Sequence, residues 1–215
     1  MAIATYAELT DEVKRWLNRD DPDTINSIPA FINFAEKEIF RVLKLPSYEK
    51  LVELKLEHNK AEVPYDLVQL IEIYTKDNRA GRHTSHRELL RHRSGDLKHD
   101  SFYYARVGNN YHFHDGDDLA STEVYCHYFQ DPPELSYNNQ VTPLLQTAPD
   151  LLLFTALRHG SVFAEDVEKA QYWEQRSDNA MQEIMKQLED DNMSGSPQVV
   201  ERIYESETGA RVIYY

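Results

Sequence analysis

Residues 147–157 read TAPDLLLFTAL, and this stretch predicts a helix that is buried on most of its sides. Apolar residues fill nearly every position after the aspartate, so no face of the helix is polar enough to meet water along its whole length. Thr147 and Asp150 lie three residues apart and flank Pro149, which indicates a capping box at the start of the helix. A helix of this kind needs other elements packed around it.

Two helices are predicted near the start of the chain. Thr5 and Glu8 have the capping-box spacing, and an amphipathic helix follows them. A second helix is predicted to begin near Ser27, to hold Pro29 in its first turn and to end at Pro46. The apolar positions at helical spacing are Tyr6, Leu9, Val13 and Trp16 or Leu17 in the first helix, and Ile28, Phe31, Ile32, Ala35, Ile39, Val42 and Leu43 in the second.

A long amphipathic helix is predicted after the buried one. The buried helix is predicted to end or kink around residues 160–165, and the helical period then continues to about Leu188. Its inward-facing positions are predicted to be Val167, Ala170, Trp173, Ser177, Met181, Ile184 and Leu188.

Between these helical regions the apolar period changes to two, which indicates strands. Val52, Leu54 and Leu56 alternate with charged residues in the first of them. Further strands are predicted at 61–63, 67–74, 102–107, 111–114 and 122–129, with a hairpin turn at Gly108-Asn109-Asn110 and a short helix at 87–93.

The order of elements predicts an α+β protein. We expect a helical bundle core built from both ends of the chain, residues 1–46 and 147–190. A central β-rich insertion occupies residues 47–146, and a linker with an extended C-terminal tail occupies residues 191–215.

Composition limits the classes of function. The chain has 37 Asp and Glu against 23 Lys and Arg, and a net charge of −14 disfavours broad binding to nucleic acid. No apolar run approaches the ~20 residues that a membrane span needs, and no signal peptide is readable at the start. The single cysteine, Cys126, is typical of a protein that folds in a reducing compartment.

Sequence motifs for catalysis are missing. No glycine-rich phosphate loop and no Gly-x-Ser-x-Gly elbow is present. Cys126 alternates with Val124 and Tyr128 on one strand face, which favours a buried, inert thiol. We therefore predict a protein that is not an enzyme, with no catalytic residues and no cofactor.

Histidine is the one residue type whose arrangement suggests chemistry. His112 and His114 lie on the same face of a predicted strand, with Asp115 directly after, and metals take such donors. Tyr111 and Phe113 would then hold the buried face, and no third ligand is fixed by the spacing. We predict no metal site here. The alternative function is a metal-binding module or metal-dependent enzyme that uses His112, His114 and Asp115.

Residues 79–98 are rich in basic residues, although the chain as a whole is acidic. Six basic residues stand there against two acidic ones, and they form either a solvated face or a contact with an acidic neighbour. The residues predicted for an acidic-partner contact are Arg82, Arg87, Arg91 and Arg93.

The two ends of the chain together resemble a known family. The N-terminal part contains TYAEL (5–9), WLNRDD (16–21), IPAFI (28–32) and AEKEI (35–39) followed by Arg41. The later part contains APDLLL (148–153), then Ala156-Leu157, Ala170 and Trp173-Glu174. These residues resemble the adaptor, or head–tail connector, proteins of short-tailed bacteriophages. The similarity covers most of residues 5–190 and is weaker through the β insertion.

The resemblance implies a structural subunit of a homo-oligomeric ring, usually twelve-fold. Such a ring binds beneath the portal protein, extends the DNA channel used in genome packaging and ejection, and offers a platform for tail, nozzle or fibre proteins. DNA passes without specific binding, and no membrane partner is implied. The location is then the head–tail junction of the virion, after assembly in the host cytoplasm. A host-interaction or regulatory module is a third alternative.

The C-terminal segment is predicted to bind a partner. Residues 199–215 follow a polar linker and contain two β-like apolar runs that are too short to bury themselves. We expect another chain to cover them, either a neighbour's sheet edge or a groove of the portal, although folding back onto the β insertion is the alternative. The predicted partner-binding residues are Val199, Val200, Ile203, Tyr204, Val212, Ile213, Tyr214 and Tyr215.

Overall fold

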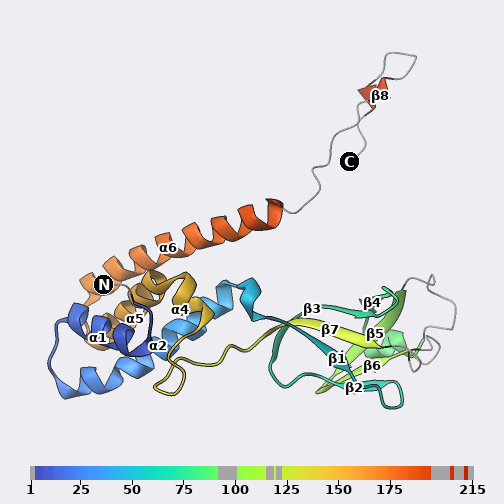
Figure 1. Cartoon of the computed structure of the whole chain (residues 1–215), viewed down its shortest axis with the longest axis horizontal. Coiled ribbons are helices and arrows are strands. Elements are labelled where there is room, and N and C mark those ends of the chain that lie inside the picture. Colours follow the sequence, from blue (N-terminus) through green and yellow to red (C-terminus); the bar gives the residue numbers. More distant parts are fainter. Residues whose placement is uncertain are drawn as a thin grey trace.

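The computed structural model describes residues 3–91, 101–114, 119, 123–194, 204–205 and 211–212, and it describes side chains as far as residue 190. Within this part, helices and one large mixed sheet make the chain an α+β protein, as predicted. Figure 1 shows α1, α2, α4, α5 and α6 grouped at one end, and strands β1 to β7 at the other.

The helices and strands follow each other in an order close to the predicted one. The helices are α1 (Tyr6–Leu17), α2 (Pro22–Val42), the 3-10 turn η1 (Pro46–Tyr48), α3 (His86–Leu89), α4 (Pro143–Thr147), α5 (Pro149–Phe163) and α6 (Val167–Ser194). The strands are β1 (Glu49–Leu54), β2 (Lys60–Glu62), β3 (Leu67–Thr75), β4 (Ala80–His83), β5 (Ser101–Val107), β6 (Asn110–Phe113), β7 (Val124–Gln130), β8 (Tyr204–Glu205) and β9 (Arg211–Val212).

The start of α1 confirms the first predicted capping box. The Thr5 hydroxyl accepts a hydrogen bond of 3.2 Å from the Glu8 backbone N–H, and the Glu8 carboxylate accepts one of 3.0 Å from the Thr5 N–H. The helix ends at Asn18, which takes a left-handed conformation with φ 49°. Asparagine tolerates this conformation better than most residues, so the chain turns there without glycine.

The predicted start of α2 was wrong. The helix begins at Pro22, where Asp21 is the N-cap and accepts a hydrogen bond of 3.0 Å from the Thr24 N–H. Aspartate followed by proline is itself a strong helix start, and this signal overrides the one near Ser27. Pro29 therefore lies inside α2, where burial of the apolar residues around it offsets the hydrogen bond it removes.

The predicted capping box around Pro149 was also wrong. Thr147 ends α4 instead, and Ala148 is the N-cap of α5 without a side-chain hydrogen bond. Thr142 supplies a cap one helix earlier, accepting a hydrogen bond of 3.3 Å from the Leu145 N–H. The predicted burial of α5 is confirmed, because Leu151, Leu152, Leu153, Ala156 and Leu157 are all buried.

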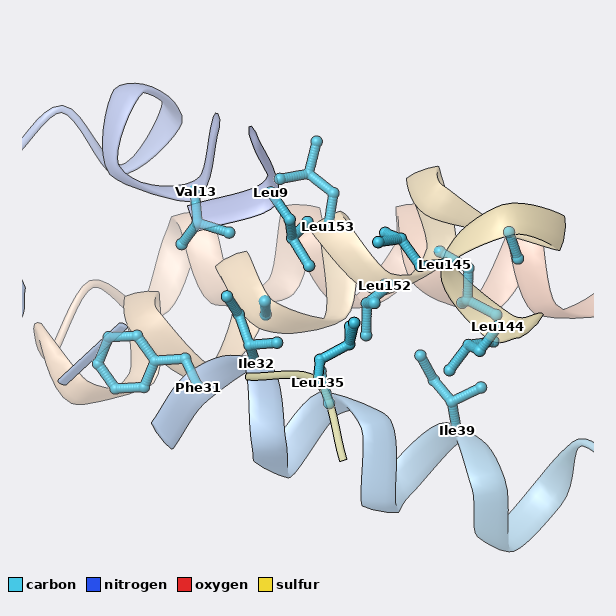
Figure 2. Close-up of a cluster of buried hydrophobic side chains, with 14 of the residues drawn as sticks. Leu9, Val13, Phe31, Ile32, Ile39, Leu135, Leu144, Leu145, Leu152 and Leu153 are labelled. Atoms are coloured by element: carbon cyan, nitrogen blue, oxygen red, sulfur yellow. The ribbon is translucent and has the colours of Figure 1, made fainter. Parts of the chain in front are cut away.

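One hydrophobic cluster joins α1, α2, α4, α5 and α6. Figure 2 shows side chains from α1, α2, α4 and α5 pointing into a common space, among them Leu9, Ile32, Leu145 and Leu152. Leu135, from the segment between β7 and α4, completes this cluster. Residues more than a hundred positions apart in the sequence therefore share one core.

Three predicted core positions were wrong. Trp16 is 42% exposed, Val42 is 56% exposed and Val167 is 66% exposed. On α1 and after α2, the buried positions are held by Leu17 and Leu43, which the same spacing predicts beside Trp16 and Val42. Val167 is the first residue of α6, where the chain has only just turned back from α5.

The seven-stranded sheet has the order β1-β7-β3-β4-β5-β6-β2. All its pairs are antiparallel except β4 with β5. The predicted hairpin is confirmed as β5 and β6, with Gly108 at φ 60° in its turn. β4 was not predicted, because its residues Ala-Gly-Arg-His show no apolar alternation. Gly81 is required there, since a Cβ would lie 2.7 Å from the backbone oxygen of Ile73.

A second hydrophobic cluster belongs to the sheet. Its largest buried side chains are Phe102, Tyr111, Tyr128 and Ile73. Cys126 lies in this cluster and is fully buried, as predicted. The chain thus buries apolar surface in two places, one among the helices and one inside the sheet.

The C-terminal strands β8 and β9 pair with each other, with Tyr204 opposite Val212. The other predicted partner-binding residues lie outside the described residues: Val199, Val200, Ile203, Ile213, Tyr214 and Tyr215.

Candidate functional site

The histidines of β6 lie as the alternation predicts. Tyr111 and Phe113 are buried, with 1% and 3% of their surface exposed, and His112 and His114 occupy the other face. The His86 ring of α3 packs on His112, with ring centroids 5.1 Å apart. Partial burial lowers the pKa of His112, and the positive charges of Lys60 and His86 lower it further.

This arrangement offers little to a metal ion. Within the described part of the chain, no three His, Cys, Asp or Glu side chains stand close enough together to bind one. Asp115, the carboxylate of the alternative site, lies outside the described residues. The thiol of Cys126 is equally unsuited to chemistry, since burial raises its pKa to about 12 and keeps it protonated at neutral pH.

The predicted acidic-partner contact maps to β4 and α3. Arg82, Arg87 and Arg91 are all exposed, and among the described residues none of the three forms an ion pair. Arg93 lies outside the described residues. The structure leaves these guanidinium groups open to solvent, which is compatible with either predicted role of the segment.

An aromatic face, not predicted as a surface, covers the side of α1, α5 and α6. It consists of Trp16, Phe154, Tyr172, Trp173 and Arg176. Phe154 stacks on Trp173 with centroids 5.8 Å apart, and Trp16 lies 5.5 Å from Trp173. The guanidinium carbon of Arg176 is 5.6 Å from the Tyr172 ring, so a cation caps one end of the face.

Two hydrogen bonds fix the edge of the aromatic face. The Trp16 indole N–H donates to Glu12 at 2.9 Å, and Arg176 Nε donates to the Tyr172 hydroxyl at 3.2 Å. Trp16 and Tyr172 nevertheless keep 42% and 49% of their surface exposed. Large aromatic side chains that are ordered yet exposed are the residues that protein interfaces favour.

A second apolar surface, the α5–α6 hollow, lies where α5 turns into α6. It has a volume of about 400 Å³ and includes His159, Val162, Val167 and Glu174 in its lining. Val162 and Val167 are 63% and 66% exposed, and the nearby Phe34 of α2, whose ring centroid is 5.8 Å from that of His159, is 56% exposed. Exposed apolar groups gathered in this way mark an interaction site more often than isolated ones do.

An ionic network fixes the rim of the hollow. Arg158 and His159 of α5 both bind the carboxylate of Glu38 on α2, the histidine at 3.0 Å. Burial opposes ionisation of Glu38, but Arg158 and His159 outweigh it and hold its pKa below the usual value. The network therefore ties α2 to α5 at the rim of the hollow.

The sheet has a groove between its two edges. Among the described strands, β1 pairs only with β7 and β2 only with β6, and the residues of these edge strands line a groove of about 860 Å³. Tyr65, at one end of the groove, is 99% exposed. Unpaired strand edges can accept an extended peptide, so this groove is a third candidate surface.

These surfaces suit binding to other proteins better than catalysis. Among the described residues, no helix is long and apolar enough to cross a membrane. A family model described as SU10 adaptor protein matches residues 4–201, which is most of the chain. The chain belongs to the SU10 adaptor protein family. The resemblance read from the helical segments is therefore confirmed.

Membership of the SU10 adaptor family gives a structural role as a phage adaptor. An adaptor of this family is part of the virion and interacts with other phage head and tail proteins. No curated protein matches the sequence significantly.

Sequence reasoning missed the two apolar surfaces for one reason. It assigned Trp16 and Val167 to the core because they continue the helical stripes. Phe34, Val162 and Phe163 could have indicated an exposed apolar surface, because each is a large apolar residue that lies off the predicted stripe.

Proposed function

We propose that this SU10 adaptor protein is a subunit of a head–tail connector ring. The ring binds the portal protein, extends the DNA channel and offers a platform for tail, nozzle or fibre proteins. The observation that carries this proposal is the family match over residues 4–201. The exposed aromatic face and the α5–α6 hollow support it, because a subunit that works by packing needs such surfaces.

Charge supports the passage of DNA. A chain with net charge −14 repels the phosphate backbone at long range, so DNA slides through a channel of such subunits without binding specifically. We expect assembly in the host cytoplasm to depend on the same charge. Many copies side by side repel each other, and the portal ring then acts as the template that brings them together.

The two hydrophobic clusters suggest that the helical part and the β insertion of each subunit have different roles. We assign residues 1–46 and 147–190 to a helical unit and residues 47–146 to the insertion. Tyr48, Leu135, Leu144 and Leu145, at the two ends of the insertion, pack in the helical cluster, and the strands have a cluster of their own. In this arrangement the helical unit makes the ring. The insertion, with Arg82, Arg87 and Arg91 exposed, reaches an acidic neighbour.

The C-terminal segment attaches the ring to its partner. Its apolar and aromatic residues are the ones predicted to bind, and they come last in the chain after a polar linker. An extended segment that adds to a sheet edge or lies in a groove buries its side chains and satisfies its backbone hydrogen bonds.

Sedimentation velocity tests the proposal. At low salt the isolated chain is expected to sediment as a monomer of 25.2 kDa, and it should form a ring complex when purified portal is added. Higher salt should ease self-association by screening the charge. A chain that does not bind the portal at any ionic strength would contradict the proposed function.

A further inference from the structure

The aromatic face and the α5–α6 hollow lie on opposite flanks of the same helix. On α6, Val167, Gln171 and Glu174 face the hollow, and Tyr172 and Arg176 belong to the aromatic face. With 3.6 residues per turn, the mean directions of the two sets differ by roughly 150° around the helix axis. The buried residues Ser177, Ala180 and Ile184 point between them, toward the core.

The two flanks carry opposite charges. On the hollow side, Glu165 and Glu174 are exposed, and Asp178 follows Glu174 by about one turn; none of the three forms an ion pair with a described residue. On the other flank, the exposed guanidinium of Arg176 likewise has no carboxylate partner in the described part of the chain. Two further charges lie at these surfaces and are already paired: Glu12 beside Trp16 with Arg15, and Arg158 in the lining of the hollow with Glu38. The remaining charges make the hollow acidic and the aromatic face basic, so the two surfaces are complementary and stand on opposite sides of one subunit.

We propose that the aromatic face of one copy binds the α5–α6 hollow of the next copy. This contact is heterologous, because two different surfaces of identical chains meet. A heterologous contact whose rotation closes generates a ring, so this inference deepens the proposed function and rests on it. Tyr172 and Trp16 then cover the exposed Val162 and Val167, while Arg176 approaches Glu174.

A symmetric contact of either surface with itself is disfavoured by charge. Two hollows face to face would bring Glu174 and Asp178 of one copy against the same residues of the other. Two aromatic faces would oppose two Arg176 side chains. Like charges brought together in this way cost free energy and suppress the wrong pairing, so the mixed contact is the one that the side chains favour.

Cysteine cross-linking distinguishes these pairings. Val162→Cys places a thiol in the hollow and Tyr172→Cys places one on the aromatic face, and the only natural cysteine is buried. The full-length variants are treated with a short bismaleimide, at high protein concentration and also with purified portal rings. The double variant should give a ladder of multimers. A mixture of the two single variants should give dimers and nothing larger, and each single variant alone should stay monomeric. Val68→Cys, exposed on β3, is the control and should not cross-link.

Charge reversal provides a second test that removes no further apolar side chain. Arg176→Glu and Glu174→Arg should each reduce cross-linking at least tenfold when placed in the double-cysteine background, and the two together should restore it. Lys14→Glu, an exposed charge change elsewhere on α1, should have no effect.

The outcomes separate this contact from the proposed function. Dimers from either single-cysteine variant alone would overturn the heterologous contact. So would a double-cysteine variant that joins the portal ring without cross-linking, although the proposed function would stand. Cross-linking into multimers by a chain that never binds the portal would support the contact and overturn the proposed function. A chain that does neither overturns both.

Discussion

The carboxylate of Glu36 on α2 accepts a hydrogen bond of 2.9 Å from the backbone N–H of Leu135, ninety-nine positions later in the chain. Leu135 lies in the segment that returns from β7 to α4, and its side chain enters the helical core. The neighbouring Lys37 binds Glu134 of the same segment at 3.1 Å. Two consecutive residues of α2 therefore hold the returning segment against the helices.

The environment of Glu36 makes stability depend on pH. Glu36 is 8% exposed, and burial raises its pKa from 4.5 to about 7 despite the hydrogen bond from Leu135. Between these two pH values the folded state holds a proton that the unfolded state has released. Stability therefore falls as pH rises from about 4.5 to 7, and the loss is complete above that range.

We predict that Glu36→Gln stabilises the protein at pH 8. Glutamine keeps an acceptor for the Leu135 N–H and removes the buried charge, so the free energy of unfolding should rise by up to about 3 kcal/mol. At pH 4.5 the two proteins should unfold at nearly the same denaturant concentration. Urea unfolding at both pH values checks this, and a variant that is less stable at pH 8 would show that the charge itself is needed.

Substitutions of Leu152 and Trp16 should lower the free energy of unfolding by different amounts. Leu152 is fully buried among α1, α2 and α5, so Leu152→Ala should lower the free energy of unfolding by about 2–5 kcal/mol. Trp16→Ala should cost less, about 1–2 kcal/mol, because 42% of the indole is already in water. Thermal melts of both variants compare them. An equal or larger loss for Trp16→Ala would place the aromatic face in the core.

The spacing of apolar residues in the sequence predicted the helices well, but it predicted where they begin and end poorly. Leu9, Ile32, Ile39 and Leu152 are buried as their spacing predicts, because one face of a helix repeats every 3.6 residues. Helix ends depend on single capping side chains. Asp21 and Thr142 took the capping roles that had been expected further along the chain.

The sheet was predicted less completely than the helices. The sequence pattern identified β1, β2, β3, β5, β6 and β7, but it could not show that β2 pairs with β6 about fifty positions later, or that β1 becomes an edge. Pairing partners depend on how the whole sheet curls, which local patterns do not encode. The candidate surfaces could not be predicted for a similar reason. Whether Val162 or Trp16 is exposed depends on how the helices pack, which the local sequence pattern does not encode.

We predict that the purified protein carries no stoichiometric transition metal. His112 sits beside the positive groups of Lys60 and His86, and no described carboxylate or thiol completes a site around it. Elemental analysis of the full-length chain should find far less than one zinc or iron per chain. About one metal per chain, lost in a His112→Ala, His114→Ala double variant, would restore the alternative function.

Removal of residues 196–215 should separate folding from attachment. The helical and sheet cores lie before residue 190, so the melting temperature of the truncated chain should stay within a few degrees of the full chain. Binding to the portal ring should weaken at least tenfold, because the predicted partner-binding residues are gone. A truncated chain that unfolds would show that the C-terminal segment belongs to the core.

The central claim is that this SU10 adaptor protein is a connector subunit organised by the portal. Electron microscopy of purified chain mixed with purified portal tests it most directly. The account predicts a ring of this chain attached to one end of every portal ring, and no ring in samples without the portal at low salt. Portal rings that stay bare in the presence of excess folded chain would contradict it.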